Sequence, residues 1–492
     1  MTSINVHNNE PVSLSSIKFL DKVTFSQSVK ADLASGKRMI GLLPARKNDP
    51  SKIIAVLADP SSSLISIAGC DFKNGPLEFE SFANEYPHTN FFECELSEDY
   101  GFIPLNHPWM RPVRKQNVIF GKTPYEFYRI TGEEIHEVAV GPIHAGVIEP
   151  GHFRFQCHGE LVYNLEINLG YQHRNIEDLI IKSNSVQRLI LAESVAGDTV
   201  MGNISAHCNA MEGLSGTVPD KRAQIIRFIG EEIERIAMHI GSLSGIATDV
   251  GFSLAANSYG RIRTIMINSL ALICGSRFGR GLFTYGGVRF DITDNIIKTL
   301  KDNLKFVADD ILKINKYMFS SVGALSRFET TGKVSSEDAE TVGLVGVAGR
   351  SCGIRKDTRV DFPYGAYKFI PVSIITMNSG DVYARAFIRS LEINESFRHI
   401  MEQLEKLPQG EISSTMKDPA ADSLIISMTE GFRGEIVHIA CTDNSGGLVQ
   451  YKIKDPSFNN WYGLSIALRN TAISDFPLCN KSFDLSYAGH DL

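Results

Sequence analysis

The sequence contains no closely spaced cysteines. Its eight cysteines are isolated, and no CxxC motif occurs. Zinc ribbons, ferredoxin-type iron–sulfur sites and thioredoxin-like redox pairs place their cysteines a few residues apart. The sequence therefore excludes these sites and predicts buried, reduced single thiols.

Long apolar runs and charge of one sign are also lacking. The longest uncharged apolar candidate, residues 264–276, is shorter than the roughly 18 to 20 residues that a spanning helix needs. The N-terminus lacks the basic and then apolar layout of a signal peptide, so we expect no export. The net charge of −7 gives no reason to expect binding to nucleic acid or to an anionic membrane surface.

Several catalytic signatures are missing. The sequence has no GxSxG nucleophile elbow, no HExxH pair and no Walker lysine. Glycine-rich stretches at 286–288 and 343–349 do not follow nucleotide-loop spacing, so we interpret them as turns or sites of close backbone packing.

The patterns that are present predict an α+β fold. Residues 1–115 carry three short apolar runs between turn residues, typical of a small α+β domain. We expect a linker over 116–140 and a second domain over 141–492, mainly a helical bundle with short flanking β-sheets. A hairpin is predicted around residues 158–160. The tail from 423 is expected to mix short strands with loops, with a hairpin turn at 431–435.

Three long amphipathic helices are predicted in the second domain. Their apolar residues recur every three to four positions, and Asp220 is a possible N-cap of the first. The helices cover residues 219–246, 295–318 and 381–407.

One segment concentrates groups that could carry chemistry. Residues 140–155 place two histidines, a glutamate and an arginine among glycines and prolines. Irregular backbone with several titratable groups often lines a site. The same composition also fits a solvated loop.

This segment resembles the opening of the [NiFe]-hydrogenase large subunit of the formate hydrogenlyase and hydrogenase-4 type, and of the related 49 kDa subunit of complex I. The resemblance continues through YQHRNIE and EEIERIAMHI. It ends with YGGV, DFPL and SFD. Upstream, FECELSEDYG and HPWMR resemble the 30 kDa subunit of complex I. The order implies a fusion of a 30 kDa-like domain with a 49 kDa-like domain.

The cysteines that bind nickel in the family are absent from this sequence. Active members hold nickel with two CxxC pairs, and the matching positions here are Ala196, Thr199, Ser486 and Gly489. Alanine and glycine supply no donor, and soft thiolates are what bind such a centre. We therefore expect no [NiFe] site and no metal bound by this chain.

Complex I also lacks these cysteines, and the resemblance implies a quinone in the vacated space. His152 matches the histidine expected there, but no tyrosine lies between Glu193 and His207. Asp198 and Thr199 are the polar groups left at the first lost pair. A desolvated Asp198 would have a raised pKa and could relay protons, or it could be a cap or surface carboxylate.

The candidate cavity residues are therefore His152, Glu193, Asp198, Thr199 and Ser486. Each has a structural alternative. His152 could be a hydrogen-bonded turn histidine, and Glu193 and Ser486 carry the same ambiguity.

The resemblance implies a peripheral-arm subunit of a membrane-bound, complex I-like, energy-converting hydrogenase-related oxidoreductase complex. Its place would be the cytoplasmic face of the inner membrane. The implied partners are a small iron–sulfur subunit holding the cluster, a ferredoxin-like subunit and antiporter-like membrane subunits. Two alternatives stay open: a quinone-reducing NADH dehydrogenase-like subunit, and a non-redox structural coupling subunit of an ion-translocating complex.

Overall fold

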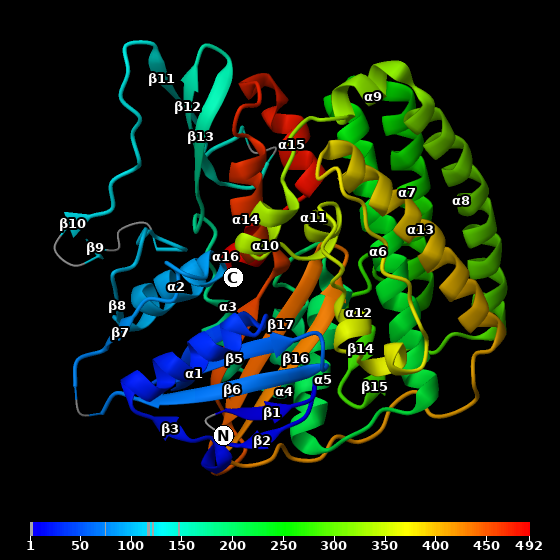
Figure 1. Ribbon diagram of the computed structural model, residues 1–492. Helices are drawn as coiled ribbons and strands as arrows, with labels where there is room; N and C mark the ends of the chain where they lie inside the picture. The colour runs from blue at the N-terminus through cyan, green and yellow to red at the C-terminus, as the bar shows by residue number, and fades with distance from the viewer. Residues whose placement is uncertain (1–2, 74, 116–118, 121–122, 146–147) are drawn as a thin grey trace.

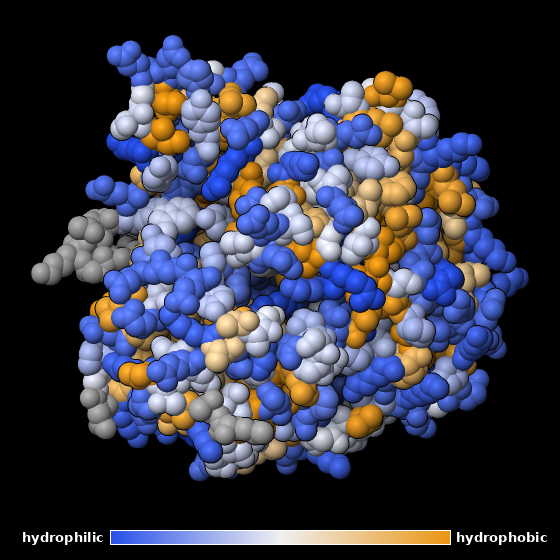
Figure 2. Space-filling view, in the orientation of Figure 1, coloured by the Kyte–Doolittle hydropathy of each residue, from blue (hydrophilic) through white to orange (hydrophobic). Residues whose placement is uncertain are grey.

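The computed structural model describes residues 3–73, 75–115, 119–120, 123–145 and 148–492 (Figure 1). Helices and several small sheets are mixed, so the α+β prediction is confirmed. No helix within these ranges is both long and apolar enough to cross a bilayer. On the face seen in Figure 2, hydrophilic residues dominate and apolar ones show in small groups between them.

The N-terminal region forms one sheet with two helices. The sheet has the order β1-β6-β5-β4, with β3 paired to β6. Its elements are β1 (Ile4–Val6), β3 (Phe19–Leu20), α1 (Lys22–Ala34), β4 (Arg38–Arg46), β5 (Asp49–Asp59), β6 (Leu64–Asp71) and α2 (Asn90–Tyr100). The three predicted apolar runs are β4, β5 and β6.

Both faces of this sheet are buried, which explains why β5 is apolar at consecutive positions. Ile53 and Leu57 face a core shared with the helices, whereas Ile54 and Val56 face a core shared with residues of a second sheet. The alternation follows from the two-residue period of a strand. That second sheet has the order β18-β17-β16-β2. Its strands are β2 (Val12–Ser13), β16 (Ser423–Gly431), β17 (Gly434–Thr442) and β18 (Leu448–Lys454).

The bundle lies on the other side of the second sheet (Figure 1). The three predicted long helices are confirmed as α6, α8 and α13, and Asp220 caps α6 by accepting from the backbone N–H of Arg222. The bundle consists of α5 (Val200–Ser215), α6 (Lys221–Asp249), α7 (Ser253–Cys274), α8 (Asp294–Ser320) and α13 (Val382–Glu405).

A three-stranded sheet packs beside the C-terminal helices and contributes Phe153 and Phe155 to the main core (Figure 1). It consists of β11 (Ile135–Val140), β12 (His152–His158) and β13 (Leu161–Asn168), so the predicted hairpin is confirmed. The predicted linker contains β9 (Ile119–Phe120), β10 (Thr123–Pro124) and β11, and its residues 116–118 and 121–122 lie outside the described ranges.

The C-terminal tail differs from the prediction after residue 454. The expected strands and loops give way to α14 (Pro456–Ala467), α15 (Phe476–Phe483) and α16 (Tyr487–Asp491). These helices are short, and α14 and α16 are almost wholly buried, so their sequences show no clean amphipathic period. Asp455 caps α14 through the N–H of Ser457, and Pro456 occupies its first turn, a start signal that was available in the sequence.

Shorter helices connect these parts. They are α3 (Ile176–Lys182), α4 (Ser185–Ala192), α9 (Val322–Phe328), α10 (Ser336–Thr341), α11 (Gly346–Arg350) and α12 (Thr358–Asp361), with a 3-10 turn η3 (Gly365–Lys368). Two short strands, β14 (Phe283–Thr284) and β15 (Gly287–Val288), form a hairpin, and β7 (Glu78–Glu80) pairs with β8 (Ile103–Leu105).

Candidate functional site

Two arginines join the segments at which the resemblance expects the two pairs of nickel ligands. Arg174 donates to the backbone carbonyl of Val195 at 2.8 Å and to that of Ala488 at 3.0 Å. Arg433 binds the Asp198 carboxylate through two hydrogen bonds of 2.7 Å, and its Nε donates to the backbone carbonyl of Asp484. Segments 194–199 and 484–489 are therefore brought together, far apart as they are in sequence.

Arg433 occupies the turn between β16 and β17. Its backbone lies so close to Gly346 that a Cβ there would approach the Arg433 carbonyl oxygen closer than 3.0 Å, and Gly346 has a φ of +62°. Only glycine meets both conditions without strain. The prediction of close backbone packing in the stretch 343–349 is thus confirmed at Gly346, and the contact fixes where the Arg433 side chain starts.

The Arg433 guanidinium is surrounded by three carboxyl groups. Burial alone would lower the pKa of Arg433, but Asp198, Asp484 and Asp455 together raise it, so the cation is permanent. Burial raises the pKa of Asp455, whereas Lys481 and Arg433 hold that of Asp484 below its usual value against the effect of its own burial. The fixed positive charge of Arg433 thus lies beside two acids whose pKa values are shifted in opposite directions, Asp455 upward and Asp484 downward.

The four positions where thiolates are expected do not suit a metal centre. The Thr199 hydroxyl lies 3.0 Å from an Arg433 nitrogen, and Ser486 Oγ accepts from the backbone N–H of Gly489 at 2.9 Å, which caps α16. A Cβ at Gly489 would lie closer than 3.0 Å to an Asp455 oxygen. No cluster of three potential ligands among histidine, cysteine, aspartate and glutamate occurs in the described part of the chain.

A cavity of about 660 Å³ opens beside the Asp198–Arg433 pair. The Asp198 side chain is 39% exposed whereas that of Arg433 is 4% exposed, so the carboxylate faces the opening and the cation closes its inner end. Aromatic rings and acids form the walls. The lining includes His144, Glu149, Phe153, Phe155, Asp249, Phe476, Lys481 and Tyr487.

Only part of the predicted residue set meets at this cavity. Asp198 lines it, Thr199 lies behind Asp198 in the same hydrogen-bonded group, and Ser486 lies between two lining residues. His152 is placed elsewhere: it begins β12, and its Nδ1 lies 3.3 Å from the Gly141 carbonyl. Glu193 also points away, accepting from the backbone N–H of Gly281 at 2.7 Å, and burial raises its pKa.

The structure also shows lining residues that the sequence analysis missed. Arg433 lies in the turn 431–435 that was predicted only as a hairpin. Tyr487 supplies a phenol from the C-terminal segment, although none lies near the first lost pair, and burial raises its pKa to about 12. Asp249 ends α6, and burial raises its pKa. The sequence offered one indication of Arg433: it is a single arginine between Gly431 and Gly434, in the turn that joins two apolar strands.

Comparison with known proteins shows what this chain is similar to. The family profile described as "Respiratory-chain NADH dehydrogenase, 49 Kd subunit" matches residues 249–423. The carbon monoxide-induced hydrogenase of Rhodospirillum rubrum is 29% identical over 71% of this chain and 97% of its own length. Formate hydrogenlyase subunit 5 of Escherichia coli is 26% identical over 84% of this chain and 77% of its own.

A third relative carries two subunit letters, C and D, in its name. The NADH-quinone oxidoreductase C/D protein of Bacteroides thetaiotaomicron is 28% identical over 73% of this chain and 74% of its own length. The chain is therefore similar to subunits of complex I-like oxidoreductase complexes. It is a homologue of the hydrogenase subunits and of the C/D subunits of NADH-quinone oxidoreductase, as the sequence resemblance indicates.

Proposed function

We propose that the chain is a peripheral-arm subunit of a membrane-bound, complex I-like, energy-converting hydrogenase-related oxidoreductase complex, and that it holds no [NiFe] site of its own. One observation carries the second part. Arg433 forms an ion pair with Asp198 and donates to the Asp484 carbonyl, and so joins the two segments that would otherwise supply nickel ligands. Oxygen and nitrogen groups bonded to each other are poor substitutes for four soft thiolates.

The pair gives the cavity a proton-handling role in this proposal. The Asp198 side chain is exposed to the cavity, and the ion pair with Arg433 holds its carboxylate in position. A neighbouring cluster in the small iron–sulfur partner would change its charge on reduction, and the Asp198 carboxylate is the group placed to respond. The ferredoxin-like subunit and the antiporter-like membrane subunits are the further partners that the sequence resemblance implies.

A second candidate is quinone reduction. The cavity is lined by several aromatic rings, and Tyr487 and His144 offer polar atoms, a combination that suits an apolar ring with polar oxygens. Quinone analogues that change turnover of the purified complex would favour this alternative. The third alternative, a structural coupling subunit, predicts that cavity substitutions leave turnover unchanged.

The test is to purify the native complex through this chain and compare substitutions in it. We expect iron–sulfur and membrane subunits to co-purify, and Asp198→Ala to lower turnover at least about tenfold, within the range of a lost proton-transfer group. His152→Ala tests the other predicted position. Asp310→Ala, which breaks the surface pair with Arg261, is the matched control. Unchanged turnover in Asp198→Ala would favour the structural alternative.

A further inference from the structure

A second cavity lies along the same helix as the first. It has a volume of about 370 Å³, and its lining includes Ser205 and Asn209 of α5, Glu231 of α6 and Tyr364. The main cavity begins at Asp198, just before α5 starts. With a rise of about 1.5 Å per residue, the seven positions from Asp198 to Ser205 separate the two cavities by roughly 10 Å.

Two glutamates of α6 occupy the space between the cavities. α5 and α6 lie side by side and run in opposite directions, since Glu234 binds the start of α5 and Arg227 binds Glu212 near its end. Glu234 and Glu231 are three residues apart on α6, so their side chains are neighbours on one face of the helix. Each is buried.

Glu234 performs a task that α5 leaves open. Thr199, the N-cap of α5, makes no side-chain capping bond. The Glu234 carboxylate instead accepts from the backbone N–H groups of Met201 at 2.8 Å and Gly202 at 3.3 Å. Glu234 therefore binds the backbone three residues after Asp198, and the nearby Asp198 carboxylate helps to raise the pKa of Glu234.

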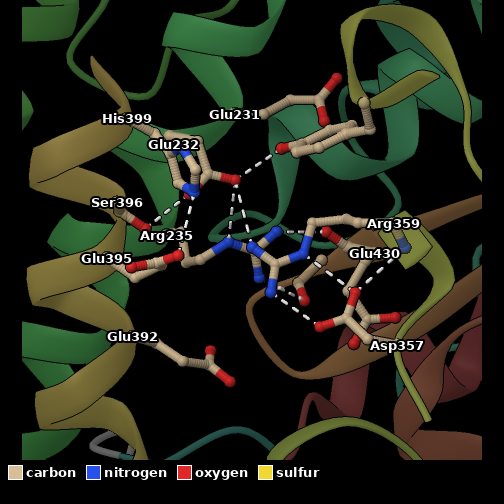
Figure 3. Close-up of polar contacts among 12 residues, drawn as sticks. Glu231, Glu232, Arg235, Asp357, Arg359, Glu392, Glu395, Ser396, His399 and Glu430 are labelled. Atoms are coloured by element: carbon tan, nitrogen blue, oxygen red, sulfur yellow. Dashed lines mark hydrogen bonds and ion pairs between the residues drawn. The ribbon is translucent and has the colours of Figure 1, made fainter. Parts of the chain in front are cut away.

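Glu231 continues the line to the second cavity. It accepts from the Tyr364 hydroxyl at 3.0 Å and from Ser205. Figure 3 shows Glu231 to one side of the ion pairs made by Glu232 and Arg235. Glu231 also lines the second cavity, whose rim reaches Val218, a side chain that is 77% exposed.

The titration behaviour separates these two glutamates from their neighbour. Burial raises the pKa of Glu234 to about 8, against the two backbone donors, and that of Glu231 to about 7, against Ser205 and Tyr364. The charged groups that face them are Asp198, Arg227, Glu232 and Arg235. Burial would raise the pKa of Glu232 as well, but Arg235 and Arg359 outweigh it and lower this pKa to about 2. Glu232 therefore stays an anion.

We propose that Glu234 and Glu231 form a proton path that links Asp198 in the main cavity with the second cavity, which Glu231 lines. The inference rests on the proposed function and adds a route to it. In each step one proton leaves a carboxylic acid and binds the neighbouring carboxylate, and no electron moves along the path. Groups that gain and lose a proton near neutral pH suit such transfer.

Infrared spectroscopy of the full chain tests the two groups directly. We expect the carbonyl bands of Glu231 and Glu93 to vanish as pH rises through about 7, and that of Glu234 as pH rises through about 8. Glu231→Gln should remove the Glu231 band and Glu234→Gln the Glu234 band. Glu93→Gln is the matched control, because burial raises the pKa of Glu93 to about 7 in the N-terminal region, away from both cavities.

Deuterium exchange tests the connection. Mixing with D₂O should shift the Glu234 band quickly in the wild type and in Asp198→Asn and Glu231→Gln, because each single variant leaves one end open. The double variant Asp198→Asn/Glu231→Gln should exchange at least about tenfold more slowly. Equal exchange in the double variant and in the wild type would overturn the path.

The purified complex separates this inference from the proposed function. Glu234→Gln should lower proton-coupled turnover at least about tenfold, and Glu93→Gln should leave it within about twofold. Wild-type coupling in Glu234→Gln would overturn the path while the subunit assignment stands. Failure of the chain to co-purify with a complex would instead overturn the proposed function, with the infrared result unaffected.

Discussion

The molecule contains two groups of charged residues that lie close together and differ in nearly every respect. The first, here called the ionic cluster, is closed, because all its side chains are buried and in ion pairs. Figure 3 labels all of its members except Arg350. The ionic cluster consists of Glu232, Arg235, Arg350, Asp357, Arg359, Glu392 and Glu430. The second, the Asp198–Arg433 pair, is open on its Asp198 side to the main cavity.

The comparison separates charges that hold the fold from charges available for chemistry. Arg350 binds Glu392 of α13 at 2.7 Å and Glu430 of β16 at 2.9 Å, which ties the bundle to the hairpin. Arg433 follows Glu430 by three residues on that hairpin. The closed cluster therefore sets the position of the open pair, and only the open pair can meet a ligand.

The largest effect is expected from breaking the closed cluster. Arg350→Met would leave Glu392, Glu430 and Asp357 without a shared cation in a buried setting, so we expect a loss of about 3–5 kcal/mol in the free energy of unfolding. Guanidinium denaturation measures it. Arg398→Met, in an exposed pair with Glu395, should cost about 1 kcal/mol or less. Similar losses in the two variants would contradict the distinction.

A smaller loss is expected where the hairpin touches α11. Gly346→Ala adds a Cβ against the Arg433 carbonyl at a positive φ and should cost about 2–3 kcal/mol. Gly251→Ala is matched in φ, +70°, but has open space around it, so it should cost about 1 kcal/mol. Equal costs measured by denaturation would show that the backbone contact at Gly346 is unimportant.

The next expected effect is on how stability changes with pH, and it comes from the buried Glu234. The pKa of Glu234 is about 8 in the folded chain, above the ordinary value of 4.5, so the folded state retains a proton that the unfolded state releases. Its contribution to stability is complete below pH 4.5 and is lost as pH rises towards 8. Glu234→Gln should therefore lose less stability than the wild type between pH 5 and about pH 9. Parallel denaturation curves for both proteins over that range would refute the assigned direction.

The smallest stability change is expected at the open pair itself. Asp198 is partly exposed, and Arg433 keeps Thr199 and the Asp484 carbonyl as partners, so Asp198→Asn should cost only about 1 kcal/mol. Thermal unfolding checks this. A loss comparable to that of Arg350→Met would mean that the pair holds the fold as the ionic cluster does.

The sequence predicted elements with strong periodicity and failed where burial is complete. α6, α8 and α13 each present an apolar stripe and a polar face, which a 3.6-residue period reveals. α14 is buried on nearly all sides, so periodicity could not distinguish it from strands and loops. α15 has only eight residues, too few for a helical period to be recognised.

The site was predictable only in part, for a related reason. Asp198 and Thr199 could be named because the family motif marks their position along the chain. Arg433 and Tyr487 reach the same place from distant segments, and only tertiary packing brings them there. His152 and Glu193 share the motifs, but their side chains bind Gly141 and Gly281, and their proposed roles stay predictions.

The most direct test is a metal analysis of the native complex purified through this chain. We predict far less than one nickel per chain, with density from cryo-electron microscopy showing the Asp198 carboxylate against the Arg433 guanidinium. One nickel per chain, located between segments 194–199 and 484–489, would contradict the account.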